Sequence, residues 1–192
     1  MRGWHFPRMI AHRGGGVLAP ENTLAGMQEA RQRGFKAVEF DVMLAADGVP
    51  VLMHDHRFGR TIGGRGSVSG TTSAELAARD AGSWLSPRFR GEPVPMLGDV
   101  IRWLHAAGIW MNIEIKPAPG HDAQTGRAVA LCTRALWSTL NDASQAAIAP
   151  LFSSFSATAL QAAQQALPSS RVRFCTSASL HTGSVSSRIW TA

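Results

Sequence analysis

Two acidic residues, Glu39 and Asp41, lie two positions apart in the apolar run AVEFD of residues 37–41. Side chains at i and i+2 of a β-strand project from the same face, so these carboxylates would lie side by side near the end of a strand. Carboxylates held this close in an apolar setting repel one another, and a shared cation or a shared proton relieves the repulsion. The spacing predicts a metal site, with a pair of solvated acids on an edge strand as the alternative.

Three further apolar runs end in side chains that can do chemistry. One ends in His12 and Arg13, a second ends in His54, and a third carries Glu114 and Lys116 two positions apart. A parallel barrel assembles its site from the C-terminal ends of different strands, and apolar runs with polar ends fit that arrangement. We therefore predict an α/β barrel whose strand ends bring these groups together.

The acids of these runs form a set of oxygen ligands without a thiolate. Glu39, Asp41 and Glu114 favour Mg²⁺ or Ca²⁺ over zinc, because both hard cations prefer carboxylate oxygens. The alternative for Glu114 is an ion pair with Lys116 or with an arginine. The predicted cofactor is a divalent cation, Mg²⁺ or Ca²⁺.

The two histidines suggest acid–base chemistry. His12 and His54 have an unperturbed pKa of about 6.5, so one can be neutral while the other is charged near neutral pH. One can then remove a proton while the other protonates a leaving alcohol. The alternative is that either is a core residue or a metal ligand. Arg13 and Lys116 would add positive charge suited to a phosphoryl anion, with structural salt bridges as the competing explanation.

Strands and helices that alternate along the chain would position these groups. A capping box, Thr72 followed by Glu75, marks the start of one helix. The other predicted helices are residues 24–33, residues 97–107, residues 125–140 and a helix that Ser156 caps and Pro168 ends. Together with a fifth strand at residues 149–155, these elements make about five strand–helix units.

The connection between the Glu39 strand and the His54 strand gives conflicting signals. Asp47 and Gly48 form a turn sequence between two apolar runs, which is a hairpin signal and favours antiparallel strands. We retain a parallel order, with residues 42–48 as a compact excursion that returns the chain to the bottom of the barrel.

Two segments depart from the strand–helix pattern. Residues 55–97 are irregular and rich in glycine and proline, and we interpret them as an inserted subdomain over the same barrel end as the polar residues. Residues 169–192 hold seven serines and no acid. We interpret residues 1–168 as a partial barrel and residues 169–192 as a serine-rich tail that is foreign to the fold.

The composition argues against several other classes of protein. The formal charge is +6, but the first 142 residues carry 16 basic and 13 acidic side chains and the rest carry three arginines, which is too dilute for a nucleic-acid footprint. Cys132 and Cys175 provide neither a disulfide framework nor a zinc site. No secretion signal is visible and no run approaches the ~20 apolar residues of a membrane span. We therefore expect a cytoplasmic protein.

Six short motifs follow one another along the chain. They are HRG at 12–14, APENT at 19–23, EFD at 39–41, DG at 47–48, HD at 54–55 and NIEIK at 112–116. Together they resemble the glycerophosphodiester phosphodiesterases, most closely the bacterial cytoplasmic enzymes of glycerol-3-phosphate uptake systems. The likeness covers about residues 8–168 in unbroken order.

The resemblance implies a TIM barrel with a subdomain inserted after strand 3, a bound divalent cation, and hydrolysis of glycerophosphodiesters to sn-glycerol 3-phosphate and an alcohol. It also implies no helix between the second and third strands, which accounts for the hairpin signal. The family's site residues fall on Glu39, Asp41 and Glu114 for the metal, on His12 and His54 for acid–base catalysis, on Arg13 and Lys116 near the phosphate, and on Glu21 and Asn22 at its border.

The chain departs from the family pattern at its end. That family has an eight-stranded barrel, and the last three strands have no visible counterpart after Pro168. We expect an incomplete barrel, with self-association through open edges and weak or no activity. The alternatives are an inactive fragment that retains the motifs, another barrel phosphodiesterase such as a phospholipase-type enzyme, and a basic nucleic-acid binder suggested only by the sequence pI of about 10.9.

Overall fold

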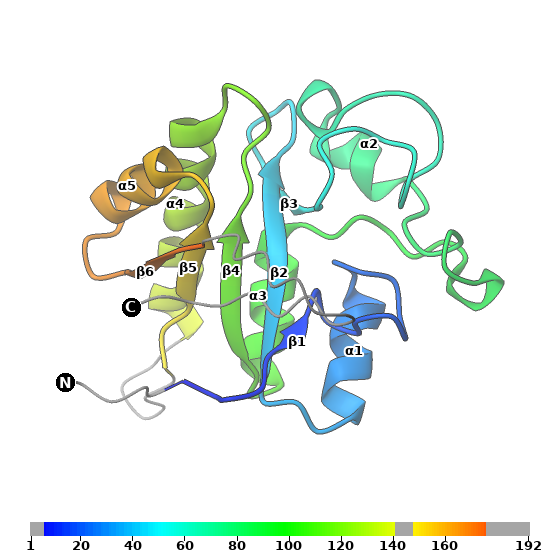
Figure 1. The fold of residues 1–192 in the computed structure, drawn as a ribbon, viewed down its shortest axis with the longest axis horizontal. Helices are drawn as coiled ribbons and strands as arrows, with labels where there is room; N and C mark the ends of the chain where they lie inside the picture. The colour runs from blue at the N-terminus through cyan, green and yellow to red at the C-terminus, as the bar shows by residue number, and fades with distance from the viewer. Residues whose placement is uncertain (1–5, 141–147, 176–192) are drawn as a thin grey trace, which may run out of the picture.

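The computed structural model describes residues 6–140 and 148–175, which contain one six-stranded sheet with helices packed against it (Figure 1). The strands are β1 (Ala11–His12), β2 (Ala37–Leu44), β3 (Pro50–Leu52), β4 (Trp110–Ile115), β5 (Leu151–Ser154) and β6 (Arg171–Phe174). β1, β2, β4, β5 and β6 are parallel neighbours in that order, and β3 pairs with β2 alone. Five parallel strands with intervening helices are the early part of a barrel.

The helices form where the caps and the apolar periodicity predict them. They are α1 (Leu24–Gln32), α2 (Ser73–Ala77), α3 (Leu97–Ala106), α4 (Asp122–Leu140) and α5 (Ala157–Ala166), with two short 3₁₀ turns at Val68–Gly70 and Pro87–Phe89. The capping box of Thr72 and Glu75 is complete, and the Ser156 hydroxyl accepts a hydrogen bond from the backbone N–H of Ala159. These caps satisfy amides that a helix start leaves without partners.

The predicted parallel order of the His54 strand is wrong. β3 is antiparallel to β2, with Val42 opposite Leu52. The turn sequence decides the direction, because Gly48 adopts a left-handed φ of +77° and its N–H donates to the carbonyl of Ala45 at 3.0 Å. His54 therefore follows a hairpin strand beside the barrel rather than a strand of the barrel.

The expectation that no strand follows Pro168 is also wrong. β6 lies at Arg171–Phe174 and is parallel to β5, with Leu151 opposite Arg171 and Ser154 opposite Phe174. Arg171 and Arg173 alternate with Val172 and Phe174, which is the period of a half-buried strand, but the run is only four residues long and stands in a serine-rich tail. The later part of the predicted tail, residues 176–192, lies outside the described residues.

The two faces of the central strands differ in character. Val38, Phe40 and Val42 of β2 pack in the main apolar core, which includes residues of α1, α3, α4 and α5. On the opposite face, Ala37 of β2 packs with Trp110 and Leu151 in a smaller apolar cluster. Because side chains alternate along a strand, the residues that follow on that same face are Glu39 and Asp41. The acidic side chains Glu39 and Asp41 therefore lie next to this smaller apolar cluster, on the same face of the sheet.

A second core joins the β2–β3 hairpin to the segment that follows it. Met43 and Val51 of the hairpin pack with apolar side chains of that segment, all of them buried, among them Ile62, Leu76 and Val94. The hydrophobic burial that fixes the segment after His54 is thus largely separate from the core that fixes the site. No helix in the described ranges is long and apolar enough to cross a membrane.

Candidate metal centre and active site

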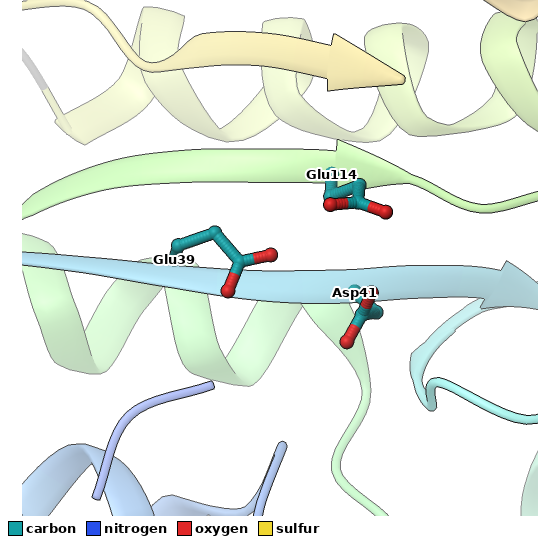
Figure 2. A group of neighbouring side chains, drawn as sticks. All are labelled: Glu39, Asp41 and Glu114. Carbon is teal, nitrogen blue, oxygen red and sulfur yellow. The ribbon is translucent and has the colours of Figure 1, made fainter. Parts of the chain in front are cut away.

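Three buried carboxylates lie together on one face of two neighbouring strands. Glu39 and Asp41 lie in the middle of β2 rather than near its end as predicted, and Glu114 comes from β4 directly opposite Asp41 in the register. The three residues are 4%, 0% and 0% exposed, and one oxygen of each lies within 4.8 Å of the others (Figure 2). The sequence predicted this grouping from the i, i+2 spacing, and the parallel register brings in Glu114.

Two basic side chains reach the carboxylates from different strand ends. Nε of Arg13 lies 3.1 Å from Oδ2 of Asp41, and the backbone N–H of Arg13 donates to Oε2 of Glu39 at 3.1 Å. Nζ of Lys116 lies 3.6 Å from Asp41 and 3.8 Å from Glu114. The predicted Arg13 and Lys116 therefore do enter the site, but acids outnumber bases there, so the centre keeps negative charge.

Asn22 holds Asp41 through both ends of its amide. Its Nδ2 donates to Oδ2 of Asp41 at 2.9 Å, and its Oδ1 accepts the backbone N–H of Asp41 at 3.0 Å. Arg13 and Asn22 both adopt left-handed backbone conformations, with φ of +53° and +57°. Such conformations in non-glycine residues cost of order 1–3 kcal/mol and persist where surrounding contacts fix them. The loop after β1 is therefore held in a shape that aims these side chains at Asp41.

The two predicted catalytic histidines both lie near this centre, His12 beside Glu39 and His54 beside Lys116. Nε2 of His12 is 3.7 Å from Oε2 of Glu39, and the His12 side chain is 51% exposed. Nδ1 of His54 is 2.7 Å from Oδ1 of Asp55, while its Nε2 contacts Nζ of Lys116. Because the Lys116 ammonium can only donate, Nε2 of His54 is the acceptor and Nδ1 carries the proton toward Asp55.

The surroundings of His54 favour its neutral form. Burial lowers the pKa of His54, and nearby Lys116 and Arg13 act in the same direction. Asp41 and Asp55 oppose this effect, but the net pKa of His54 remains below its usual value. At neutral pH His54 is therefore a neutral imidazole oriented by a carboxylate, which is the form that a general base requires.

Arg60 is a site residue that the sequence analysis missed. Its guanidinium donates two hydrogen bonds of 2.7 Å to Glu21 and one of 2.6 Å to Asp55. Glu21 also accepts a 2.9 Å hydrogen bond from Arg13. Burial acts to raise the pKa of Glu21, but Arg60 and Arg13 lower it and the net shift is downward. Arg60 thus joins the loop after β1 to the loop after β3, and Glu21 orients Arg13. Only the fold brings these loops together.

Asn112 and Ser153 are further residues of the site. Asn112 stands opposite Glu39 in the register and Ser153 stands opposite Glu114, so both belong to the face that carries the carboxylates. Both are fully buried, and neither side chain hydrogen bonds to another residue within the described ranges. A buried polar group without a partner costs about 1–3 kcal/mol, so these two side chains are suited to a bound ion or its water.

The centre fits a hard divalent cation. Its charged ligands are carboxylates with an excess of negative charge, and a polar amide and hydroxyl lie on the same face. Mg²⁺ and Ca²⁺ take such oxygen ligands and complete their coordination with water. Glu39, Asp41 and Glu114 could therefore hold a divalent metal, as the sequence indicated.

Comparison with known proteins identifies the family. The profile of the glycerophosphoryl diester phosphodiesterase family matches residues 12–188. The chain belongs to this family. The match extends past Pro168, in keeping with the strand at β6.

Relatives and solved structures are similar over most of the described fold. A glycerophosphodiester phosphodiesterase of Caldanaerobacter subterraneus is 39% identical over 108 residues, covering 56% of this chain and 44% of the relative. A phosphodiesterase of Oleispira antarctica, solved with its product sn-glycerol-3-phosphate, is 38% identical with a TM-score of 0.80, over 88% of this chain and 65% of that one. The glycerophosphodiester phosphodiesterase of Agrobacterium tumefaciens is 33% identical with a TM-score of 0.72, over 85% and 64%.

These likenesses confirm the predicted fold class, an α/β barrel of this family, of which residues 6–140 and 148–175 form one six-stranded sheet. The chain spans about half the length of the curated relatives it matches, 47% and 44% of two of them. The roles of individual side chains remain predictions that rest on the geometry described above.

Proposed function

We propose that this chain carries the site for metal-assisted hydrolysis of glycerophosphodiesters to sn-glycerol 3-phosphate and an alcohol. The observation that carries the proposal is the buried cluster of Glu39, Asp41 and Glu114, with His12 beside Glu39 and His54 beside Lys116. The similar phosphodiesterase of Oleispira antarctica, solved with sn-glycerol-3-phosphate, supports this substrate class. That this chain itself is active is also proposed, because the chain spans only part of the length of its relatives.

Glu39, Asp41 and Glu114 would hold the cation, Mg²⁺ or Ca²⁺. When bound, the cation supplies positive charge that stabilises the charge on phosphoryl oxygens. Arg13 and Lys116 would bind the phosphate from the protein side. Lys116 now contacts His54 and two carboxylates, and a phosphoryl oxygen would give its ammonium a new partner while releasing Nε2 of His54.

The histidines would divide the proton transfers. His54, neutral and oriented by Asp55, takes a proton from the attacking water as the oxygen of that water bonds to phosphorus. His12, close to the Glu39 carboxylate, donates a proton to the leaving oxygen as its bond to phosphorus breaks. Asp55 then stabilises the imidazolium of His54.

An assay of glycerol 3-phosphate release tests the proposal. Purified protein is incubated with glycerophosphodiesters after exhaustive chelation, and then with Mg²⁺ or Ca²⁺ restored. We expect release only with the cation. Undiminished turnover after chelation would falsify metal dependence, and absence of glycerol 3-phosphate under every condition would contradict the activity of this chain.

A further inference from the structure

A cavity of about 540 Å³ opens beside His54 and Lys116, between the ends of the barrel strands and the segment that follows β3. We name it the Arg57 cavity. Its walls include His54, Asp55, Arg57, Phe58, Arg60 and Lys116. A diester whose phosphate meets Lys116 and His54 has this cavity next to it, so one of its two ester groups can extend into the cavity.

The charged groups of the Arg57 cavity are mostly basic. Arg57, Arg60 and Lys116 each contribute a cation to its walls, and Asp55 contributes a carboxylate. That carboxylate already accepts from Arg60 at 2.6 Å and contacts Nδ1 of His54 at 2.7 Å. Arg57 is exposed and forms no ion pair within residues 6–140 and 148–175. The cavity therefore presents an available cation at Arg57 and an acid that is already engaged.

The cavity also lacks the features that bind a quaternary ammonium. Such groups are held by aromatic faces or by carboxylates without other partners. Phe58 is the aromatic residue of the wall, and the guanidinium of Arg79 lies 4.5 Å from the centre of its ring. Arg79 thus already occupies one face of this ring. A choline or ethanolamine group would enter a basic cavity whose aromatic ring and carboxylate both already contact other charged groups.

We propose that the Arg57 cavity binds the alcohol portion of the diester and selects anionic or polyhydroxylic headgroups over cationic ones. The proposal rests on the proposed function, and it assigns Arg57 as the specificity-determining residue. An exposed charge pair changes affinity by up to about 5-fold, and attraction of an anion combined with repulsion of a cation predicts a total preference of roughly 5- to 20-fold.

Binding of three diesters that share the glycerophosphate end tests this selection. Glycerophosphoinositol 4-phosphate, glycerophosphoinositol and glycerophosphocholine differ in headgroup charge. Their affinities are measured by titration calorimetry with Mg²⁺, using the His12→Ala variant to suppress hydrolysis. We expect affinity to fall in that order. High salt should reduce the difference, because the selection is electrostatic.

Variants of Arg57 separate selectivity from general binding. Arg57→Ala should reduce the preference to about 2-fold, and Arg57→Glu should favour the choline ester, as expected from removal and reversal of one charge. Arg90→Ala is the matched control, because Arg90 is an exposed arginine of the same segment outside the cavity wall. It should keep the wild-type order of affinities.

The outcomes also separate this proposal from the proposed function. Equal affinities for the three diesters, or a preference for choline that Arg57→Glu does not change, would overturn the cavity assignment while hydrolysis stands. Failure of the wild-type protein to bind any diester or to release glycerol 3-phosphate would overturn both. Headgroup selection that Arg90→Ala removes as effectively as Arg57→Ala would show a diffuse surface charge and reject the cavity.

Discussion

The carboxylates of the barrel strands and those of the segment after β3 have different surroundings. Asp80, in that segment, accepts hydrogen bonds from the backbone N–H groups of Gly82, Ser83 and Gly91 and from the Ser83 hydroxyl, at 2.6–3.0 Å. Glu114, in the barrel, lies against two other acids with oxygens within 4.8 Å.

This difference separates an acid that stabilises the fold, Asp80, from acids that are suited to bind a ligand, the three carboxylates of the barrel. Hydrogen bonds from Ser83 and backbone amides lower the pKa of Asp80, so its ionised form stabilises the folded chain. The barrel acids repel one another, and only some of their charge is balanced by Arg13 and Lys116. Neutralising an acid should therefore have opposite effects on stability in the two regions.

The largest effect is expected from Glu114→Gln. This change removes one anionic ligand, so the affinity for Mg²⁺ or Ca²⁺ should fall by about 100-fold or more. It also removes one of the repelling charges, so the metal-free protein should melt at a higher temperature. Titration calorimetry and thermal unfolding measure the two effects. Asp99→Asn, a change on the exposed face of α3, is the control and should alter neither. A lower melting temperature for metal-free Glu114→Gln would contradict the comparison.

The histidine variants should lose turnover without losing the metal. His12→Ala and His54→Ala should each reduce the rate by about 100-fold or more, the usual contribution of a general acid or base. Loss of cation affinity in either variant would make that histidine a ligand instead. Because burial lowers the pKa of His54, the acidic limb of the wild-type pH–rate profile should lie below the ordinary value of about 6.5 and should disappear in His54→Ala.

Asn112→Leu applies the same test of stability and cation affinity to an uncharged side chain of the site. The amide of Asn112 has no hydrogen-bond partner in the described part of the chain, so an apolar replacement of similar size should stabilise the metal-free protein. If the amide supports the bound cation, affinity should fall by roughly 10- to 100-fold. A variant that melts lower without metal and keeps its cation affinity would show a packing role only.

Much of the site was predictable because it depends on local sequence. The i, i+2 spacing of Glu39 and Asp41 set their common face, and the caps at Thr72 and Ser156 marked helix starts. Contacts between distant loops were not predictable. Arg60 meets Glu21 across 39 positions, and no local pattern encodes that meeting.

Two strand assignments failed for different reasons. β3 runs antiparallel to β2, as the local turn at Gly48 indicated. The prediction gave more weight to a parallel barrel than to this turn and was therefore wrong. β6 alternates arginine with apolar residues, which is the period of a strand, but its four residues are too few to stand out from the tail, and pairing with β5 fixes the segment as a strand. Propensity was a weak guide where tertiary pairing decided the structure.

The edges of the sheet give a further prediction. Within the described ranges β1 and β6 each pair with one strand, and Phe174 of β6 is 47% exposed. Exposed strand edges with apolar side chains favour pairing between chains. We expect concentration-dependent self-association in sedimentation velocity experiments, weakened by Phe174→Lys. The Trp84→Lys variant is a control, because Trp84 is similarly exposed at 40% but belongs to the segment between β3 and β4 and to no strand. A wild-type protein that stays monomeric at all concentrations would reject this expectation.

The smallest effect is expected from Asp80→Asn, which tests the other side of the comparison. The substitution places an amide group against donors that now meet a carboxylate, so the melting temperature should fall by a few degrees at neutral pH. Because the folded-state pKa of Asp80 is lowered, its contribution is present above the unfolded pKa of about 3.9 and is lost as pH falls through the folded pKa. Thermal unfolding across pH should show a constant difference from wild type down to about pH 5, and a smaller one below about pH 4. Cation affinity should be unchanged, unlike in Glu114→Gln. A difference that persists unchanged to the lowest pH would mean that packing around Gly82, rather than the charge of Asp80, holds the segment together.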